Sequence, residues 1–502
     1  MVVDISDRKT DSHEEMSFSS AKVSRKKINT VEPLIFGDNI SWRFDGFGLW
    51  DREQNRPHEE LLEALRGSGV TSLRWPAGIE GDYCHWYEMI GDDRVAQIDP
   101  FSTKRRGELV VSYPYFGLEE FFSVCDELGI PAIIQLNCGN GTPEEAADLV
   151  RWCEDNRKNV CSYCVGNEMH LGEEMVPGVR VTKTPEEYIA FFGEFYDLIS
   201  DYRDRIELGI VGLTSEHRIS HFADWDEKVL SALADRIDFV DAHLGYTPYF
   251  VSPSTVDEQM LCYLASPEYV DRVIRIQLDN IRRYCPEHYG NITLQITEWG
   301  TLGGQYSNAV PSAVFTAALL GRMTEKLAIS STSHFSALLI YERSPTLVGY
   351  AQTDDGLKVF DNAISYVFRW YSAQRTRAVL ETSVVCDRFD SDKRIGLIPE
   401  IPNAPTVYVN TYLDENTDEG SIILVNCNYK KAEKTEITLP FGIEVTDIAE
   451  VYSRDMLSCN STREQYIEEY HHTIENRIAE DGRIALMTKP VSAVRVDFRI
   501  LK

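Results

Sequence analysis

The chain has 502 residues, of which 80 are acidic and 50 are basic, giving a formal net charge of −30. This balance argues against a general nucleic-acid-binding protein, which needs a basic face to displace counterions from phosphates, and against adhesion to anionic membranes. Hydrophobic residues make up 43% and charged residues 26%, as expected of a soluble globular protein with a substantial core. A neutral small-molecule substrate is compatible with this composition.

The N-terminal stretch is polar, and we expect residues 1–16 to be disordered. It lacks the apolar core of a secretory signal, and no apolar run approaches the roughly 18 residues that span a bilayer. These features predict a cytoplasmic protein that does not enter a membrane. The 11 cysteines are scattered and odd in number, which is typical of reduced, core-filling thiols.

A CxxC pair, Cys161 and Cys164, is the one arrangement of cysteines that could suggest a metal. Their odd spacing on a strand would point the two thiols to opposite faces. No second CxxC follows at zinc-ribbon spacing. We therefore predict no metal site and no metal cofactor.

One pattern repeats from residue 33 to about 372: a short apolar run, a polar loop and an amphipathic helix. Nearly continuous apolar runs are typical of parallel strands covered on both faces. The runs are LIFGDN (34–39), VTSLRW (70–75), IPAIIQLN (130–137), VCSYCVGN (160–167), ELGIVGL (207–213), IDFVDAH (237–243), ITLQIT (292–297) and FSALLIY (335–341). Eight strand–helix units predict an α/β fold, a (β/α)8 TIM barrel over residues 33–372.

Two helix starts are clearly marked within this region. Thr142 and Thr184 are each followed by Pro-Glu-Glu, so that each Thr can cap the helix, with Pro at the first helical position and Glu at the third. This pattern predicts a capping box at both helices, in which the Thr and Glu side chains satisfy free amides of the first turn.

The pattern changes after about residue 372. Alternating runs replace helical periodicity, at 406–413, 420–429, 434–440 and 492–500. Alternation of this kind indicates antiparallel strands, so we predict a β-sandwich accessory domain over residues 373–502. Residues 17–32 alternate in the same way, and we expect them to add an N-terminal strand to that sandwich.

Two carboxylates stand where a barrel carries its chemistry, at the C-terminal ends of strands. Glu168 follows the fourth predicted strand in "YCVGNEMHLG", and Glu298 follows the seventh in "LQITEWGT". Burying a carboxylate is costly unless it is paired, protonated or catalytic. Paired carboxyls suit glycoside hydrolysis, in which one donates a proton and the other attacks or stabilises the anomeric carbon. The alternative is that each forms a structural ion pair, for instance with Arg74.

Five motifs, in this order, resemble those of the family 51 α-L-arabinofuranosidases over nearly the whole chain. They are LRWPAGIEGDYCHW, NCGNGTPEEAADLVRWCED, CVGNEMHLG, FVDAHLGY and TEWG. That family lies in a clan of (β/α)8 retaining glycosidases whose acid/base follows strand four and whose nucleophile follows strand seven. The resemblance implies an exo-acting hydrolase of terminal furanosyl residues that works by double displacement.

The resemblance also implies roles for individual residues. Glu298 would be the nucleophile and Glu168 the acid/base. Asn167 would bind the sugar 2-hydroxyl, Arg74 would keep the nucleophile ionised, and Tyr246 and His243 would orient it. Trp299 and Trp86 would wall the sugar pocket, and Asn39 would contribute a further contact. The family resemblance suggests a homo-oligomer and implies no cofactor.

The sequence departs from the family at two sugar-contacting positions. Counting back from Asp51 places Asn39 where the family has a Glu. In the second-strand motif, Ile79 stands where the family has an Asn. Such changes alter which sugar fits, although Glu80 or Asp82 could substitute. β-D-Galactofuranose has the same ring stereochemistry with a longer arm, so a β-D-galactofuranosidase, or another glycosidase of the clan, is the leading alternative.

Other function classes find less support. The segment after strand three contains glycines, as a phosphate loop does, but it lacks the third glycine and the lysine of that motif. The HExxH of zinc hydrolases and the GxSxG of serine hydrolases are absent from the sequence. A non-catalytic carbohydrate-binding barrel remains an alternative from another class, which turnover or the separation of the two carboxyl groups would distinguish.

Overall fold

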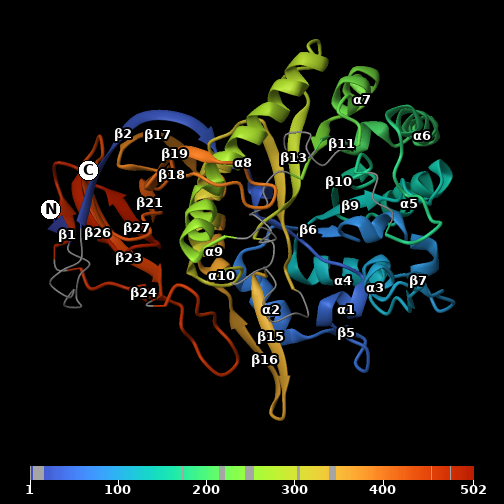
Figure 1. The fold of residues 1–502 in the computed structure, drawn as a ribbon, viewed down its shortest axis with the longest axis horizontal. Coiled ribbons are helices and arrows are strands. Elements are labelled where there is room, and N and C mark those ends of the chain that lie inside the picture. Colours follow the sequence, from blue (N-terminus) through green and yellow to red (C-terminus); the bar gives the residue numbers. More distant parts are fainter. Residues whose placement is uncertain are drawn as a thin grey trace.

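A computed structural model of the chain describes residues 2–3, 16–171, 175–213, 221–243, 254–301, 306–338, 346–453, 455–474 and 476–502. Among these residues, eight parallel strands close into a barrel, with helices around it (Figure 1). In chain order the strands are β3 (Gly37–Asn39), β6 (Ser72–Trp75), β9 (Ala132–Leu136), β10 (Val160–Val165), β11 (Leu208–Val211), β12 (Phe239–Asp241), β13 (Thr293–Trp299) and β14 (Ile329–His334). The predicted (β/α)8 barrel is confirmed.

Helices alternate with these strands. They are α2 (Glu59–Ser68), α4 (Leu118–Leu128), α5 (Pro143–Asp155), α6 (Pro185–Leu198), α7 (Trp225–Leu233), α8 (Val256–Tyr284), α9 (Val310–Thr324) and α10 (Ala363–Ser372). At α6, Thr184 and Glu187 form the predicted capping box. At α5 Thr142 caps the helix, but the Glu145 carboxylate hydrogen-bonds His85 instead of closing the box. The capping box predicted at Thr142 is therefore wrong in its second half.

The eighth barrel strand differs from the predicted run 335–341. The strand is β14, with the sequence ISSTSH, and Phe335 follows its end. Two of its hydroxyls have partners inside the protein: Thr332 Oγ1 donates to the Ile35 carbonyl and accepts from Trp299 Nε1, and Ser330 Oγ lies 2.8 Å from Thr293 Oγ1. Because the strand is built of small hydroxyl residues, it lacks the apolar run by which the other strands are recognised.

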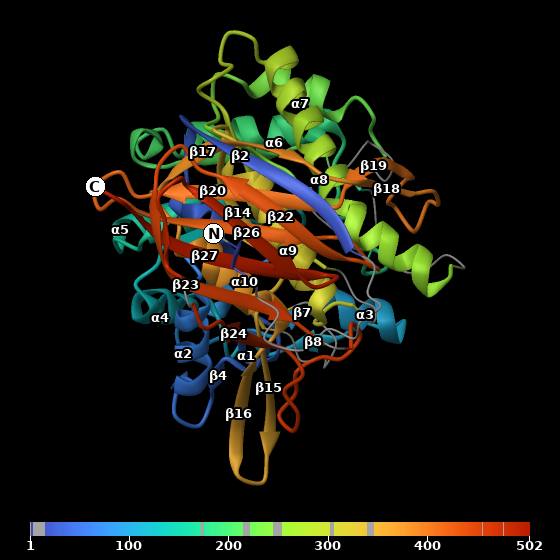
Figure 2. The same cartoon turned by 90° about the vertical axis from the view of Figure 1, so that its left-hand side faces the viewer.

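The C-terminal part forms a curled, mostly antiparallel sheet (Figure 2). Its strands are β17 (Ala378–Val385), β20 (Val407–Leu413), β21 (Glu419–Asn426), β22 (Ala432–Thr438), β23 (Ile443–Tyr452), β24 (Glu468–His471), β25 (Ile478–Ala479), β26 (Arg483–Thr488) and β27 (Ser492–Ile500). The long strand β2 (Met16–Thr30) pairs with β17 and β22, as expected of an N-terminal strand. The short strand β1 (Val2–Val3) pairs with β26, while residues 4–15 lie outside the described residues.

Alternation along the strands divides the sheet between two cores. In β21, Ile422 and Leu424 enter the sandwich core, whereas Ile423 and Val425 join the core of the barrel. Helix α9 lies between the barrel and the sheet and packs against β20, β21, β23 and β27. Its residues are buried nearly all round, which explains its apolar sequence. No helix in the described part of the chain is long and apolar enough to cross a bilayer.

Candidate active site

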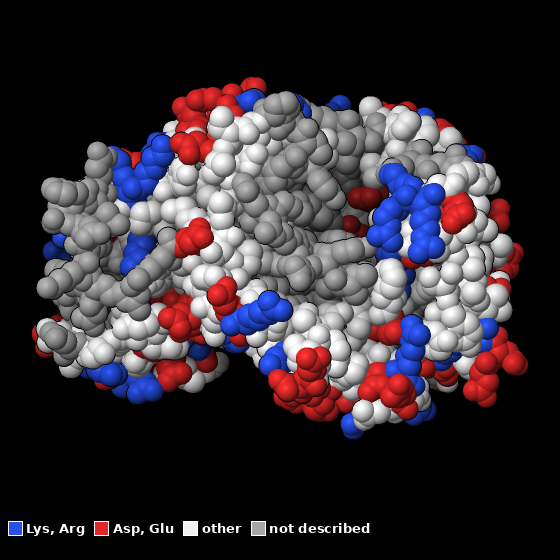
Figure 3. All heavy atoms as spheres, turned by 60° about the horizontal axis from the view of Figure 1, so that its bottom comes forward, with Lys and Arg blue, Asp and Glu red and all other residues white. Residues whose placement is uncertain are grey.

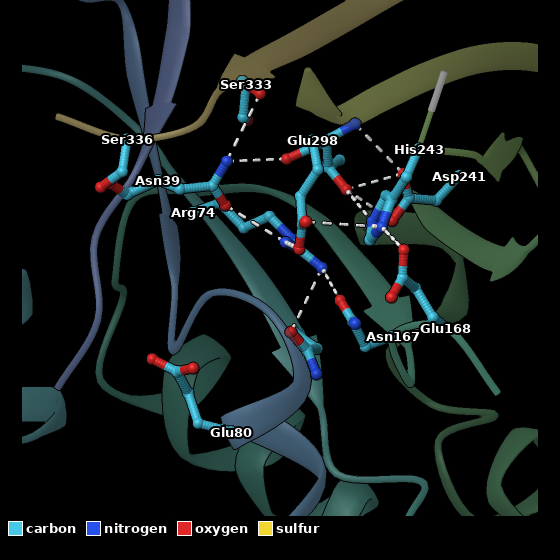
Figure 4. Close-up of polar contacts among 12 residues, drawn as sticks. Asn39, Arg74, Glu80, Asn167, Glu168, Asp241, His243, Glu298, Ser333 and Ser336 are labelled. Carbon is cyan, nitrogen blue, oxygen red and sulfur yellow. Dashed lines mark hydrogen bonds and ion pairs between the residues drawn. The ribbon is translucent and has the colours of Figure 1, made fainter. Parts of the chain in front are cut away.

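The candidate site lies at the C-terminal ends of the barrel strands, where Glu168 and Glu298 face each other (Figure 4). Glu298 is in β13 and buried, and Glu168 follows β10 with about a fifth of its side chain exposed. Glu168, His243 and Glu298 each bring one polar atom within 4.8 Å of the others. One face of the molecule is hollowed, and acidic side chains are visible inside the hollow (Figure 3).

Arg74 organises the nucleophile side of the site from β6, with no exposure to solvent. Its Nη1 donates to Glu298 Oε1 at 3.0 Å and to Asn39 Oδ1 at 3.1 Å, while Nη2 donates to Asn167 Oδ1 at 2.7 Å and Gln135 Oε1 at 3.2 Å. Burial acts to lower the pKa of Arg74, but the charges of Glu298 and Asp241 and the hydrogen bond to Glu298 act together against it, and the pKa is raised. Arg74 therefore stays cationic and keeps a positive charge against one oxygen of Glu298.

His243, just after β12, bridges the two carboxylates. Its Nδ1 lies 2.8 Å from Glu168 Oε1 and 3.6 Å from Glu298 Oε2. Burial acts to lower the pKa of His243, but the charge of Glu298 and the hydrogen bond to Glu168 raise it to about 9. The imidazole is therefore a cation at neutral pH. Thr297 supports this arrangement, since its hydroxyl donates to Asp241 at 2.7 Å and lies 3.4 Å from His243 Nε2.

Asn167 is held in one orientation. Its Oδ1 accepts from Arg74, and its backbone N–H donates to Asp82 Oδ2 at 3.2 Å. Because the carbonyl oxygen faces Arg74, the amide nitrogen is the end of Asn167 left to face a ligand. Burial raises the pKa of Asp82 to about 8, against the opposing hydrogen bonds from the Asn167 and Cys138 backbones. Asp82 thus supports the loop that carries Asn167 and Glu168, and it does so as a neutral acid at neutral pH.

Asn39, at the end of β3, is fully buried. Its Nδ2 donates to the carbonyl oxygens of Thr297 at 2.8 Å and His334 at 3.0 Å, and its Oδ1 accepts from Arg74. All of these contacts are within the protein. The geometry therefore gives Asn39 the position of a residue that fixes Arg74 against β13, and a sugar contact from it stays a prediction.

The two predicted tryptophans occupy different surroundings. Trp299, at the end of β13, is fully buried, and its Nε1 donates to Thr332 at 2.9 Å. Trp86 is partly exposed, donates to the Glu145 carbonyl at 3.1 Å and packs against Trp152 of α5. Their predicted role as walls of the sugar pocket stays a prediction. Tyr246 lies outside the described residues.

Ile79 and Glu80, two residues that the sequence singled out beside the site, lie in different surroundings. Ile79 packs against an apolar cluster of Tyr83, Met175 and Val181. Glu80, beside it, is buried and accepts from the Ser41 hydroxyl. Gln135, the polar residue within the apolar run of β9, was not predicted from the sequence. A buried polar residue inside an otherwise apolar strand is the signal that could have found it.

No family model matches the chain. Two curated relatives cover nearly all of it. One is an exo-α-(1→6)-L-arabinofuranosidase of Bifidobacterium longum, 22% identical over 93% of this chain and 94% of that protein. The other is an intracellular exo-α-(1→5)-L-arabinofuranosidase of Halalkalibacterium halodurans, 21% identical over 91% of this chain and 94% of that protein. The resemblance to family 51 is confirmed. This GH51-like chain thus has glycoside hydrolases as its relatives.

Solved structures agree with this result for the fold. The GH51 arabinofuranosidase of Xanthomonas axonopodis pv. citri is 16% identical with a TM-score of 0.78, covering 96% of this chain and all of that one. A family 51 α-L-arabinofuranosidase of Bifidobacterium longum is 16% identical with a TM-score of 0.79, covering 96% and 99%. A family 44 xyloglucanase of Paenibacillus polymyxa also matches, at a TM-score of 0.64 and 11% identity. Because another glycosidase family shares the GH51-like architecture, the fold alone does not define the sugar.

Proposed function

We propose that this chain is a retaining, exo-acting α-L-arabinofuranosidase that removes terminal furanosyl residues from oligosaccharides. The observation that carries the proposal is the approach of Glu168 and Glu298, whose nearest polar atoms lie within 4.8 Å at two strand ends of one barrel. Retaining glycosidases hold their carboxyl groups about 5–5.5 Å apart, whereas inverting enzymes leave about 6.5–9.5 Å for a water molecule. The short separation therefore supports attack by a carboxylate.

In the proposed reaction, Glu298 attacks the anomeric carbon while Glu168 protonates the departing oxygen. The glycosidic bond breaks as the bond to Glu298 forms. Glu168, now ionised, then takes a proton from water, and the resulting nucleophile displaces Glu298 and releases the sugar. Arg74 stabilises the carboxylate form of Glu298, and Asn167 offers its amide N–H to the sugar 2-hydroxyl.

The His243 cation has a defined part in this cycle. It lies against Glu168 and near Glu298, so its positive charge balances the one negative charge that Glu298 carries before attack and Glu168 carries after proton transfer. We assign His243 to positioning and charge compensation, since it reaches both carboxylates.

Location and assembly belong to the same proposal. The names of two relatives, from Halalkalibacterium halodurans and Bacteroides ovatus, describe intracellular enzymes. These names support action in the cytoplasm on imported oligosaccharides. A homo-oligomer is proposed from the family resemblance, and light scattering of the purified protein tests it.

A panel of 4-nitrophenyl glycosides tests the activity, with α-L-arabinofuranoside and β-D-galactofuranoside as the principal substrates and Glu298→Ala as the control. Release of nitrophenol from the arabinofuranoside, lost in the variant, supports the proposal. Faster turnover of the galactofuranoside than of the arabinofuranoside would favour the alternative activity, a β-D-galactofuranosidase, which the departure at Ile79 suggests. No turnover of any glycoside would favour a non-catalytic carbohydrate-binding barrel.

A further inference from the structure

A pocket lies close to Glu298, the proposed nucleophile. This pocket, which we call the Glu80 pocket, has a volume of about 260 Å³ and is lined by four phenylalanine rings and by Ser41, Arg43 and Glu80 among its polar residues. Its residues come from the segment after β3, from α1 (Arg43–Gly48), α3 (Pro100–Arg106) and the segments after β6 and β14. The pocket is therefore built at the same end of the barrel as Glu168 and Glu298.

Gly78 connects the Glu80 pocket to the nucleophile. A Cβ built on Gly78 would lie 3.4 Å from Glu298 Oε1 and 3.9 Å from Glu80 Oε2. The backbone there has a φ of +81°, which glycine adopts freely. In Figure 4, Glu80 lies on the far side of Glu298 from Glu168. Since Glu168 would protonate the leaving group, the leaving group lies on the Glu168 side of the site. The Glu80 pocket lies on the opposite side, with the furanosyl residue that Glu298 attacks.

Buried charged groups of the pocket lie beside aromatic rings that are partly open to solvent. Arg43 is 7% exposed and Glu80 is 4% exposed. Asp99 holds Arg43 through a 3.0 Å contact between Oδ1 and Nε, and the guanidinium lies over the rings of Phe44 and Phe101 at 4.9 and 5.1 Å from their centroids. Aromatic faces beside buried hydrogen-bonding groups suit a ligand that has C–H faces and hydroxyls, as a sugar ring has.

The backbone beneath the pocket is unusual. Residues 44–47 of α1 have positive φ angles, at 48°, 59°, 65° and 52°, and only Gly46 among them is a glycine. Left-handed backbone in non-glycine residues is unfavourable and is found mainly where function requires it. Here it sets Phe44 and Phe47 into the lining of the pocket.

The volume of the Glu80 pocket exceeds the volume that the exocyclic group of a single furanose fills. A water molecule takes about 30 Å³ of the liquid, so the Glu80 pocket holds several times the volume that one additional CHOH group of a hexofuranose fills. A second ring fits this volume better than a longer exocyclic arm does.

We propose that the Glu80 pocket is a subsite for a second sugar ring carried by the furanosyl residue that is released, so that the enzyme also removes terminal disaccharides. This inference rests on the proposed function. The reaction is the same hydrolysis: the bond between the inner furanosyl ring and the leaving group breaks, water supplies the hydroxyl to the anomeric carbon, and the leaving oxygen takes the proton.

The test uses 4-nitrophenyl glycosides of α-1,2-, α-1,3- and α-1,5-linked arabinobiose with the full-length enzyme, and chromatography identifies the first products. We expect arabinobiose and nitrophenol from at least one linkage in the initial phase. The Phe101→Ala variant should lower kcat/KM for that bioside at least tenfold relative to kcat/KM for the simple arabinofuranoside. Phe18→Ala, which removes an exposed ring of β2, is the matched control and should leave this ratio unchanged.

Three results would overturn the inference in distinguishable ways. Arabinose and nitrophenyl arabinofuranoside as the only first products would overturn it and leave the proposed function standing. An equal effect of Phe101→Ala on both substrates would also overturn it. If no furanoside is turned over, the proposed function fails, and calorimetry with arabinobiose then tests the pocket. Binding that Phe101→Ala weakens tenfold supports a sugar subsite. Binding that is absent, or that the variant leaves unchanged, overturns it.

Discussion

Arg74 lies 3.0 Å from Glu298 and is completely buried. The same guanidinium also donates to Asn39, Asn167 and Gln135, so one side chain holds four strand ends together. Replacement of Arg74 by Met removes the partner of a buried carboxylate and of three amides. We predict that it lowers the free energy of unfolding by about 3–5 kcal/mol, the usual cost of breaking a buried ion pair from one side.

Chemical denaturation at pH 7 measures this loss, with Arg499→Met as the control because Arg499 forms only an exposed pair with Glu419. The control should match the wild type. Equal stabilities of the Arg74 variant and the wild type would show that Arg74 does not support the site as described.

Glu168→Ala separates the two halves of the proposed reaction. An acid contributes about 10²–10⁴-fold when the leaving group needs a proton, so hydrolysis of an unactivated arabinobiose should fall by that factor. The nitrophenyl arabinofuranoside needs little help from an acid, so its first step should be affected much less. Added azide, which needs no general base, should speed its turnover. The measurements are kcat/KM for both substrates and kcat for the nitrophenyl arabinofuranoside with and without azide, and Glu227→Ala, at an exposed residue of α7, is the control. A uniform loss for both substrates without azide rescue would contradict the assignment.

His243 should make stability dependent on pH. Its pKa is raised in the folded protein from an ordinary value of 6.5 to about 9. A raised histidine pKa contributes stability that is fully present below pH 6.5 and is lost as the pH rises through 9. We therefore predict that the free energy of unfolding falls more steeply between pH 6.5 and 9 in the wild type than in His243→Asn.

The comparison with the variant is needed because Asp82, with a pKa of about 8, and Glu80, with a pKa of about 7, change stability in the same direction. Their folded pKa values are also raised, so they too lose stabilisation as the pH increases. Identical slopes in the wild type and in His243→Asn would indicate that the imidazole is not the cation bridging Glu168 and Glu298.

The grouping of Glu168, His243 and Glu298 also predicts a response to metal ions. These three side chains could jointly ligate a metal ion, and Zn²⁺ favours such nitrogen and oxygen donors. The proposed reaction needs both carboxylates free. We expect Zn²⁺ to inhibit competitively with substrate, and EDTA to leave the activity of the purified enzyme intact. Loss of activity in EDTA that Zn²⁺ restores would instead indicate a metal-dependent enzyme.

The barrel and its two carboxylates could be predicted from the sequence because each signal is local. Seven strands are apolar runs, and Glu168 and Glu298 stand directly beyond or at the ends of two of them. The eighth strand was missed because ISSTSH consists mainly of small hydroxyl residues, whereas FSALLIY, which follows it, has the apolar character that a buried strand usually shows.

The surroundings of the carboxylates depend on contacts between residues far apart in the chain. Asn39 bonds to Thr297 and Arg74, and the Glu80 pocket combines side chains from residues 41 to 336. Nothing in the local sequence indicates these contacts. The two departures at Asn39 and Ile79 could be noticed from the sequence. Only the structure shows that Ile79 packs into an apolar cluster and that Glu80 faces a pocket.

Trapping of the covalent intermediate is the direct test of Glu298 as the nucleophile. The Glu168→Ala variant is mixed with 4-nitrophenyl α-L-arabinofuranoside, quenched with acid during turnover and analysed by mass spectrometry after digestion. We predict one pentosyl group on the peptide that contains Glu298, because formation of the intermediate outpaces its hydrolysis without the general base. Continued turnover with the pentosyl group on another carboxylate, or with none on the protein, would contradict it.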